Sequence, residues 1–140
     1  MYYLFFNNYL IDAVCLESQG RYDGAYYLAG YTTELLIKAK VCKNLGIDDF
    51  FDFDNTARKT KIKSEVLRPF KVHDLEQLLI LSGVYSDFEK MLVDVDFGAA
   101  WSIIQKWNEG TRYLTGRSHN DVKDLLTSIS IFEKWIQRYL

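Results

Sequence analysis

The hydrophobic pattern of the chain is helical, and its clearest run covers residues 21–43. The residues predicted to form the core-facing side of this run fall at steps of three and four: Ala25, Leu28, Ala29, Thr32, Leu35, Leu36 and Ala39. Small residues in its first half should let a neighbouring helix come close. Glu34 and Lys38 should pair on the polar face, and Gly46 is placed to end the helix.

The same spacing predicts a first helix from Tyr2 to Ser18, with an apolar side made of Tyr3, Phe6, Leu10, Ile11, Val14 and Cys15. The turn at Gln19 and Gly20 is only a few residues long. We therefore expect the first two helices to form an antiparallel hairpin.

Three more helices are predicted in the second half of the chain. The third covers residues 73–82, and the fourth covers residues 86–107 with Ser86 as its N-cap and a kink at Gly98. The last helix should start at Asn120 or Asp121, after a polar turn. Its predicted apolar side consists of Val122, Leu125, Leu126, Ile129, Phe132, Ile136 and Leu140.

These elements define the expected fold. No segment shows the alternation of a β-strand, so we predict an all-α, up-and-down bundle of about five helices in a single domain spanning residues 1–140. Residues 45–71 form an irregular excursion, acidic and aromatic first and basic afterwards. Asp52 and Asp54 there resemble part of a calcium loop, but the glycine and the distal glutamate of that motif are missing. We therefore predict no metal site.

Composition and charge narrow the functional classes. The chain has 140 residues, 49% of them hydrophobic, which is enough for the core of one domain. Its aromatic content of 16% exceeds what one small core needs, so the surplus rings should cover an interface and a homodimer is expected. A net charge of −2 lacks the strong basicity that is usual for duplex-binding domains.

The N-terminal segment bears on location. It has no lysine or arginine before Arg21, and polar residues interrupt its apolar run, which argues against a signal peptide and a membrane span. A cytoplasmic protein without membrane contact is therefore expected. Cys15 and Cys42 lie among apolar neighbours and are interpreted as reduced core thiols, the alternative being a disulfide between the first two helices.

Three groups of residues occur in a recognisable order. They are Tyr22, Ala25, Leu28, Ala29, Gly30, Tyr31, Glu34, Leu35, Lys38 and Ala39, then His73, Asp74 and Leu75, then Trp107, Arg112 and Tyr113. In this order and spacing they resemble the HEPN family, the higher eukaryotes and prokaryotes nucleotide-binding domain. The resemblance covers most of the chain, although the excursion at residues 45–71 is longer than the usual family loop.

The resemblance implies a small helical bundle that commonly dimerises and is often encoded beside a small nucleotidyltransferase, in toxin–antitoxin or defence systems. No cofactor is expected. Some members are metal-independent ribonucleases, whose site is an arginine followed a few residues later by a histidine. In dimeric members two copies of this motif face each other. Here six residues separate Arg112 from His119.

The chemistry of such a pair is clear. A histidine that titrates near neutral pH can take the proton from a ribose 2′-hydroxyl, and a permanently charged guanidinium can stabilise charge on the phosphorane. His119 and Arg112 are therefore the candidate catalytic residues, and Glu34 would orient one of them. The candidate binding residues are Tyr31, Glu34, Lys38 and Arg117.

Structural interpretations of the same residues stay open. Arg112 could bond helix carbonyls or a carboxylate while Tyr113 packs in the bundle, and His119 could be solvated near the start of the last helix. His73 could cap or pack at the start of the third helix.

Three functions are consistent with these features. Our leading hypothesis is a dimeric HEPN-like binding or partner module in a nucleotide- or RNA-linked system, working with a nucleotidyltransferase. The residue after Arg112 supports it, because a tyrosine there is typical of members not known to cleave RNA. The second hypothesis is a metal-independent ribonuclease that uses Arg112 and His119, and the third is a purely structural interaction domain.

Overall fold

The computed structural model describes residues 2–48 and 72–140, and within these ranges the chain forms helices and no strand. In chain order the elements are α1 (Tyr2–Ser18), α2 (Tyr22–Leu45), α5 (Leu75–Leu81), α6 (Tyr85–Met91), α7 (Val95–Ile104), η2 (Glu109–Tyr113), α8 (His119–Ile136) and η3 (Gln137–Tyr139), where η marks a 3-10 helix. The predicted all-α class is confirmed for these residues. The predictions for the excursion, including the one that excluded a calcium loop, fall almost entirely on residues 49–71, outside the described ranges.

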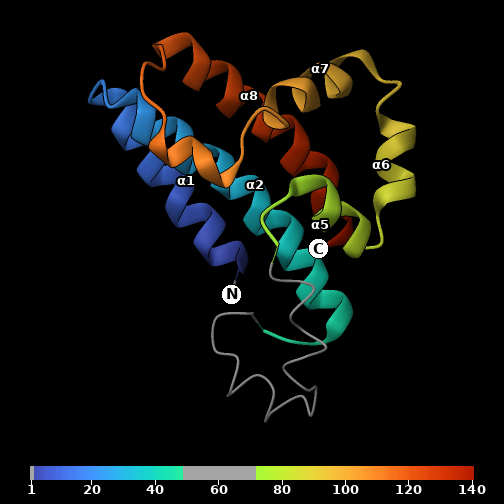
Figure 1. The fold of residues 1–140 in the computed structure, drawn as a ribbon. Coiled ribbons are helices and arrows are strands. Elements are labelled where there is room, and N and C mark those ends of the chain that lie inside the picture. Colours follow the sequence, from blue (N-terminus) through green and yellow to red (C-terminus); the bar gives the residue numbers. More distant parts are fainter. Residues whose placement is uncertain (1, 49–71) are drawn as a thin grey trace.

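The predicted hairpin of α1 and α2 is confirmed, and Figure 1 shows the two helices side by side and antiparallel. Gly46 ends α2 in the left-handed conformation, with φ of 65°, and its N–H donates to the carbonyls of Cys42 and Lys43. This is the role expected of a glycine just past a helix, because a side chain would be strained there.

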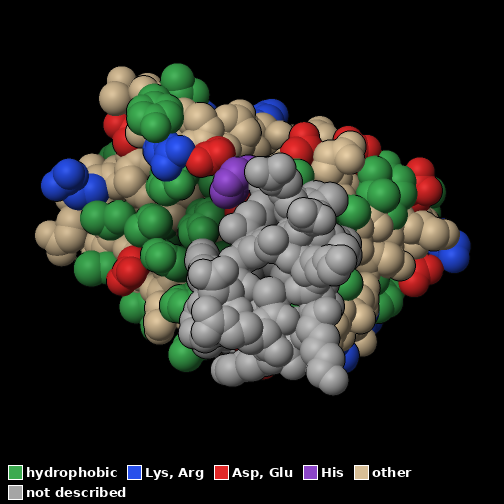
Figure 2. Space-filling model, turned by 60° about the horizontal axis from the view of Figure 1, so that its bottom comes forward, with side chains coloured by type: hydrophobic (Ala, Val, Ile, Leu, Met, Phe, Trp, Pro, Cys, Tyr) green, Lys and Arg blue, Asp and Glu red, His purple; other side chains and the backbone are tan. Residues whose placement is uncertain are grey.

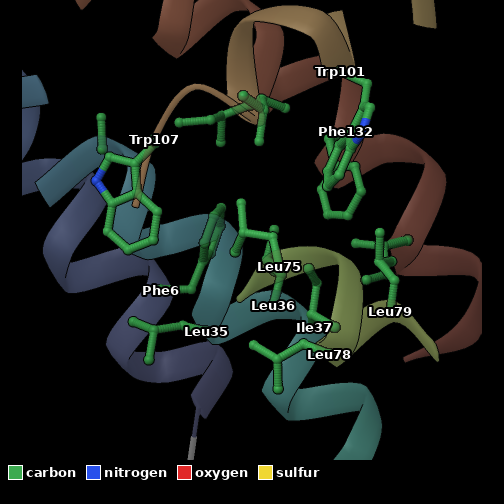
Figure 3. Packing of buried hydrophobic residues seen from close by; sticks show 14 of the residues in the cluster. Phe6, Leu35, Leu36, Ile37, Leu75, Leu78, Leu79, Trp101, Trp107 and Phe132 are labelled. Carbon is green, nitrogen blue, oxygen red and sulfur yellow. The ribbon is translucent and has the colours of Figure 1, made fainter. Parts of the chain in front are cut away.

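Helix α2 is the centre of the bundle. It contacts α1, α5, α8 and η2, and residues 32–38 are buried without interruption. Figure 3 shows Leu35 of α2 on the side of Phe6 and α1, and Leu36 and Ile37 on the side of the α5 leucines. A helix buried over seven successive residues is covered on every side. The predicted pairing of Glu34 with Lys38 is confirmed, but the pair lies in the core and not on a polar face.

The predicted fourth helix is two helices. The break lies at residues 92–94, where Oδ1 of Asp94 accepts a hydrogen bond of 2.8 Å from the Phe97 N–H and so caps α7. Ser86 is not an N-cap, because α6 begins one residue earlier. Gly98 does not kink a helix. A Cβ on it would lie 2.9 Å from the Leu92 carbonyl oxygen, so its small size lets the turn fold closely onto α7.

The last helix starts one residue before the predicted range. Ser118 is the N-cap of α8, and its side chain and that of Asp121 bond each other's backbone N–H groups in a capping box. The hydrogen bonds from Ser118 lower the pKa of the Asp121 carboxyl. His119 is therefore the first residue of α8.

The inward face of α1 differs from the predicted one. The buried residues are Tyr2, Phe6 and Ala13, whereas Ile11, Val14 and Cys15 are exposed. The interpretation of Cys15 as a core thiol was thus wrong, while Cys42 is buried as expected. Both cysteines lie in the described ranges, and no disulfide joins them. None of the helices in the described ranges combines the length and the apolar character needed to cross a bilayer.

Half of the aromatic side chains in the described ranges are buried. One cluster joins Phe88 of α6, Phe97 and Trp101 of α7, and Phe132 and Trp135 of α8, with ring centroids 4.7 to 6.3 Å apart. These five side chains are at most 8% exposed. These five rings therefore belong to the core, and they do not support the expectation of a dimer.

Trp107, in the connection after α7, packs directly on α2. A Cβ on Gly30 would lie 2.1 Å from its ring, so only glycine fits there. The indole N–H donates to the Tyr27 carbonyl over 3.0 Å. The small residues of α2 were expected to admit a neighbouring helix, but at Gly30 the neighbour is this indole.

Replacement of Gly30 by alanine should destabilise the protein by about 1–3 kcal/mol, because the indole has to move out of a closely packed site. Gly24→Ala in the same helix is the matched control. Its Cβ would meet only the end of the Leu16 side chain at 3.3 Å, so the higher helix propensity of alanine should stabilise the protein by up to about 1 kcal/mol. Urea unfolding measures both, and two changes of the same sign would contradict this account.

Candidate functional site

The candidate binding residue Tyr31, on α2, lies in an aromatic cluster with side chains from α1, α2 and the connection after α7. Its ring contacts those of Tyr9, Tyr27 and Trp107, with centroids 5.5 to 6.4 Å away. Burial raises the pKa of Tyr31 to about 12, and the negative charge of Glu34 acts in the same direction. The phenol therefore stays protonated at all physiological pH values.

Glu34 lies next to this cluster and is completely buried. Its Oε1 accepts a hydrogen bond of 2.6 Å from Nζ of Lys38, one turn along α2, and the Lys38 side chain is itself 10% exposed. Oε2 of Glu34 is buried and has no hydrogen-bond partner among the described residues. The two candidates thus form a buried ion pair whose carboxylate is only half satisfied.

His73 connects this pair to the surface. Its Nδ1 lies 2.9 Å from Oε1 of Glu34 and, facing a carboxylate that can only accept, it carries the hydrogen. On the other side of the ring, Nε2 lies 3.6 Å from Oε2 of Glu109. Glu109 in turn accepts a bond of 2.6 Å from Arg112. We call this set, Lys38, Glu34, His73, Glu109 and Arg112, the charged chain.

The charged chain runs from the core to the surface of η2. Figure 2 shows a face on which a histidine lies beside acidic and basic side chains at the surface. Beyond Arg112, the guanidinium lies 5.0 Å from the ring centroid of Tyr113, which is 77% exposed, and Leu114 is exposed as well. The outer end of the charged chain therefore exposes a cationic side chain, Arg112, next to an exposed aromatic ring, Tyr113.

A pocket of about 200 Å³ adjoins the charged chain at His73. It is lined by His73, Asp74, Leu75, Glu76, Trp101, Gln105, Trp107 and Asn108. A larger pocket of about 670 Å³ lies at the other end of α2, between the start of α1 and η3, and none of the candidate residues lines it. The candidate functional residues and the 670 Å³ pocket are therefore in different parts of the molecule.

The two candidate catalytic residues are not brought together. Arg112 is held by Glu109, whereas Nε2 of His119 lies 2.8 Å from Oε1 of Glu17 at the end of α1, with the ring on that of Tyr22. No contact joins Arg112 to His119 within the described part of the chain. Sequence proximity placed them in one motif, but each is paired with a carboxylate of its own.

The candidate binding residue Arg117 makes contacts within the protein. Its N–H donates to Asp23 over 2.8 Å, and its guanidinium lies 4.1 Å from the ring centroid of Tyr26. These contacts join the loop before α8 to the first turns of α2. The ring of Tyr26 is buried, which raises its pKa, although the nearby charge of Arg117 acts in the opposite direction.

Sequence reasoning missed three residues of this region. His73 was expected to cap or pack at the start of the third helix, but its contact with Glu34 was not predicted, and the cap of α5 is Asp74, whose Oδ1 accepts from the Gln77 N–H. Glu109 and Glu17 received no role. The signal for Glu109 was its spacing of three from Arg112 in a short helical segment, whereas nothing local linked Glu17 to a histidine far along the chain.

Comparison of the chain with protein-family models, with curated proteins and with solved structures finds no match. Within residues 2–48 and 72–140, no three histidine, cysteine, aspartate or glutamate side chains gather as ligands for a metal ion. The interpretation of the site thus depends on its geometry and on the residues that carry the resemblance.

Glu34→Ala should destabilise the protein by about 3–5 kcal/mol, because it leaves the Lys38 ammonium without its carboxylate in a buried position. Glu109→Ala, which breaks the partly exposed pair with Arg112, should cost less than about 1 kcal/mol.

The double variant Glu34→Leu with Lys38→Met tests the cause. It removes both charges and keeps the volume, so it should recover most of the loss. Urea denaturation measures all three variants. Equal costs for Glu34→Ala and Glu109→Ala would show that the buried pair is not the origin of the effect.

Proposed function

We propose that this chain is a HEPN-like binding module that acts as a homodimer in a nucleotide- or RNA-linked system, together with a nucleotidyltransferase. The observation that carries the proposal is that residues of the resemblance contact one another in the folded protein. The residues on which the resemblance depends are scattered along the sequence, yet Gly30 meets Trp107, Glu34 meets His73, and His73 and Arg112 share Glu109. If the resemblance had arisen by chance, the matching residues would not be expected to be neighbours in the folded protein.

The outer end of the charged chain supports binding. A guanidinium pairs with phosphate oxygens, and an exposed aromatic ring offers a face on which a base stacks. Arg112 and Tyr113 supply these two groups next to each other. The ion pair of Arg112 with Glu109 is partly exposed, so it is weak enough for a phosphate to compete with the carboxylate.

Binding of a fluorescein-labelled single-stranded RNA, followed by fluorescence anisotropy at low salt, tests this surface. Tyr113→Ala should weaken binding about tenfold, since stacking of one base is worth roughly 1–3 kcal/mol, and Arg112→Ala should weaken it as well and reduce the salt dependence. Arg138→Ala, an exposed arginine on η3, is the matched control and should bind like the wild type. Equal binding by all four proteins would contradict the proposed surface.

The transferase partner has a separate test. A nucleotidyltransferase gene next to the gene for this chain supports the partner module, and co-expression of the two should yield a complex that purifies as one species. Failure of the two proteins to associate would favour the purely structural interaction domain.

One observation favours the ribonuclease as a second candidate. His119 is half exposed, and the Glu17 carboxylate 2.8 Å from its Nε2 can orient the imidazole. Against it stands the separate pairing of Arg112, because a guanidinium and an imidazole that act on one phosphate have to converge on it.

Incubation of the protein with structured and single-stranded RNA in EDTA separates the two candidates. As a binding module the wild type should leave both RNAs intact. Cleavage that is lost in His119→Ala and retained in Lys123→Ala, a control on the same helix, would instead establish the ribonuclease.

A further inference from the structure

Helix α1 is apolar on two opposite sides, and α2 covers only one of them. Figure 1 shows α1 at the edge of the bundle, with α2 on its inner side. On the outer side Leu4 is 61% exposed and Ile11 is 67% exposed, and Tyr3 and Val14 are also exposed. A helix that is hydrophobic all round is normally buried all round. The outer face of α1 therefore has the character of a covered surface.

This face also excludes charge. Its exposed residues are Tyr3, Leu4, Asn7, Asn8, Ile11, Val14, Cys15 and Ser18, and Asp12 lies only at its edge. The chain has no lysine or arginine before Arg21, so the face has no cationic side chain to pair with the phosphates of a nucleic acid or with an acidic partner. Depletion of charge with aliphatic and tyrosine side chains is the composition of an interface core.

The order of residues on the face matches a second copy of itself. Leu4 and Ile11 are seven residues apart, two turns on the same side of the helix, and Asn7 and Asn8 lie midway between them. A two-fold axis through this midpoint, perpendicular to α1, places Leu4 of one copy opposite Ile11 of the other. Each asparagine then lies near its own counterpart, where two amides can donate and accept reciprocally.

We propose that the outer face of α1 is a self-association surface, on which two copies of this chain pair through antiparallel α1 helices about an axis at residues 7 and 8. The antiparallel order also sets opposite ends of the two helix dipoles side by side, which a parallel order does not. The inference rests on the homodimer of the proposed function and adds the face by which it forms. It involves none of the residues of the charged chain.

The pairing separates the two copies of the candidate catalytic histidine. Glu17, which holds His119, lies near the C-terminal end of α1, between nine and ten residues from the axis. At a rise of ~1.5 Å per residue, the two copies of Glu17 are about 28 Å apart along the helices. A dimer formed this way cannot bring two Arg112 and His119 motifs to one phosphate.

Sedimentation equilibrium of the full chain at tens of micromolar tests the face. The wild type should be a dimer, and Ile11→Lys should be a monomer because the lysine would be buried opposite an apolar side chain. Val93→Lys is the matched control, since Val93 is 87% exposed in the turn between α6 and α7, and it should stay dimeric. Circular dichroism spectra should be alike for all three proteins, which would show that Ile11→Lys still folds.

Cysteine cross-linking tests the orientation. In a Cys15→Ala background, the double variant Leu4→Cys with Ile11→Cys should form a covalent dimer on oxidation. Leu4→Cys alone should not, because its two copies lie about 10 Å apart along the helices, beyond the reach of a disulfide.

Three results would overturn the proposal. A monomeric wild type at these concentrations removes both this interface and the homodimer. A dimer that survives Ile11→Lys keeps the homodimer but assigns it to another face. Cross-linking of Leu4→Cys alone as efficiently as the double variant shows a parallel pair and excludes the antiparallel arrangement.

Discussion

The carboxylate of Glu34 in the middle of α2 is the constraint on which the rest of the structure depends. The helix is covered on all sides at this point, so the charge cannot reach bulk water. Lys38 compensates it from within the helix, and the ring of His73, just before α5, makes a hydrogen bond to the same oxygen. The contact of His73 with Glu34 therefore joins the start of α5 to the middle of α2, next to the leucines that pack between the two helices. Removal of Glu34 would also leave the Lys38 ammonium buried without its partner.

The same constraint explains why the site has an inner and an outer half. Inside, charges are paired and rings are enclosed, so Lys38, Glu34 and Tyr31 hold the architecture together. Outside, Glu109 and Arg112 form a pair that water and other ions can replace. Trp107 holds the two halves in register, since its indole fills the space above Gly30 and its N–H binds the backbone of α2. A ligand would therefore meet the outer half.

The sequence predicted the positions of the helices better than the burial and the tertiary contacts of their side chains. Both bounds of α1 and the glycine end of α2 followed from periodicity and caps, which are local properties. The burial of Glu34 did not follow, because a polar residue four positions before a lysine looks the same on a solvated face and in a covered core. The break before α7 was missed since Asp94 was read as a mid-helix residue, although its side chain is a cap. A contact such as that of Glu17 with His119 depends on how the end of α1 and the start of α8 pack in the folded protein. The sequence around either residue gives no local signal for it.

The outer face of α1 and the charged chain use different parts of the molecule, and this division bears on function. A ribonuclease that assembles its site from two chains needs the two motifs at the dimer axis, whereas an α1 pair places them at its two ends. Association through α1 would leave each copy of Arg112 and Tyr113 exposed and independent. A symmetric dimer with two separate binding surfaces gains affinity for a long or repeated partner through effective concentration, without any composite site. This arrangement suits a binding module better than a composite nuclease.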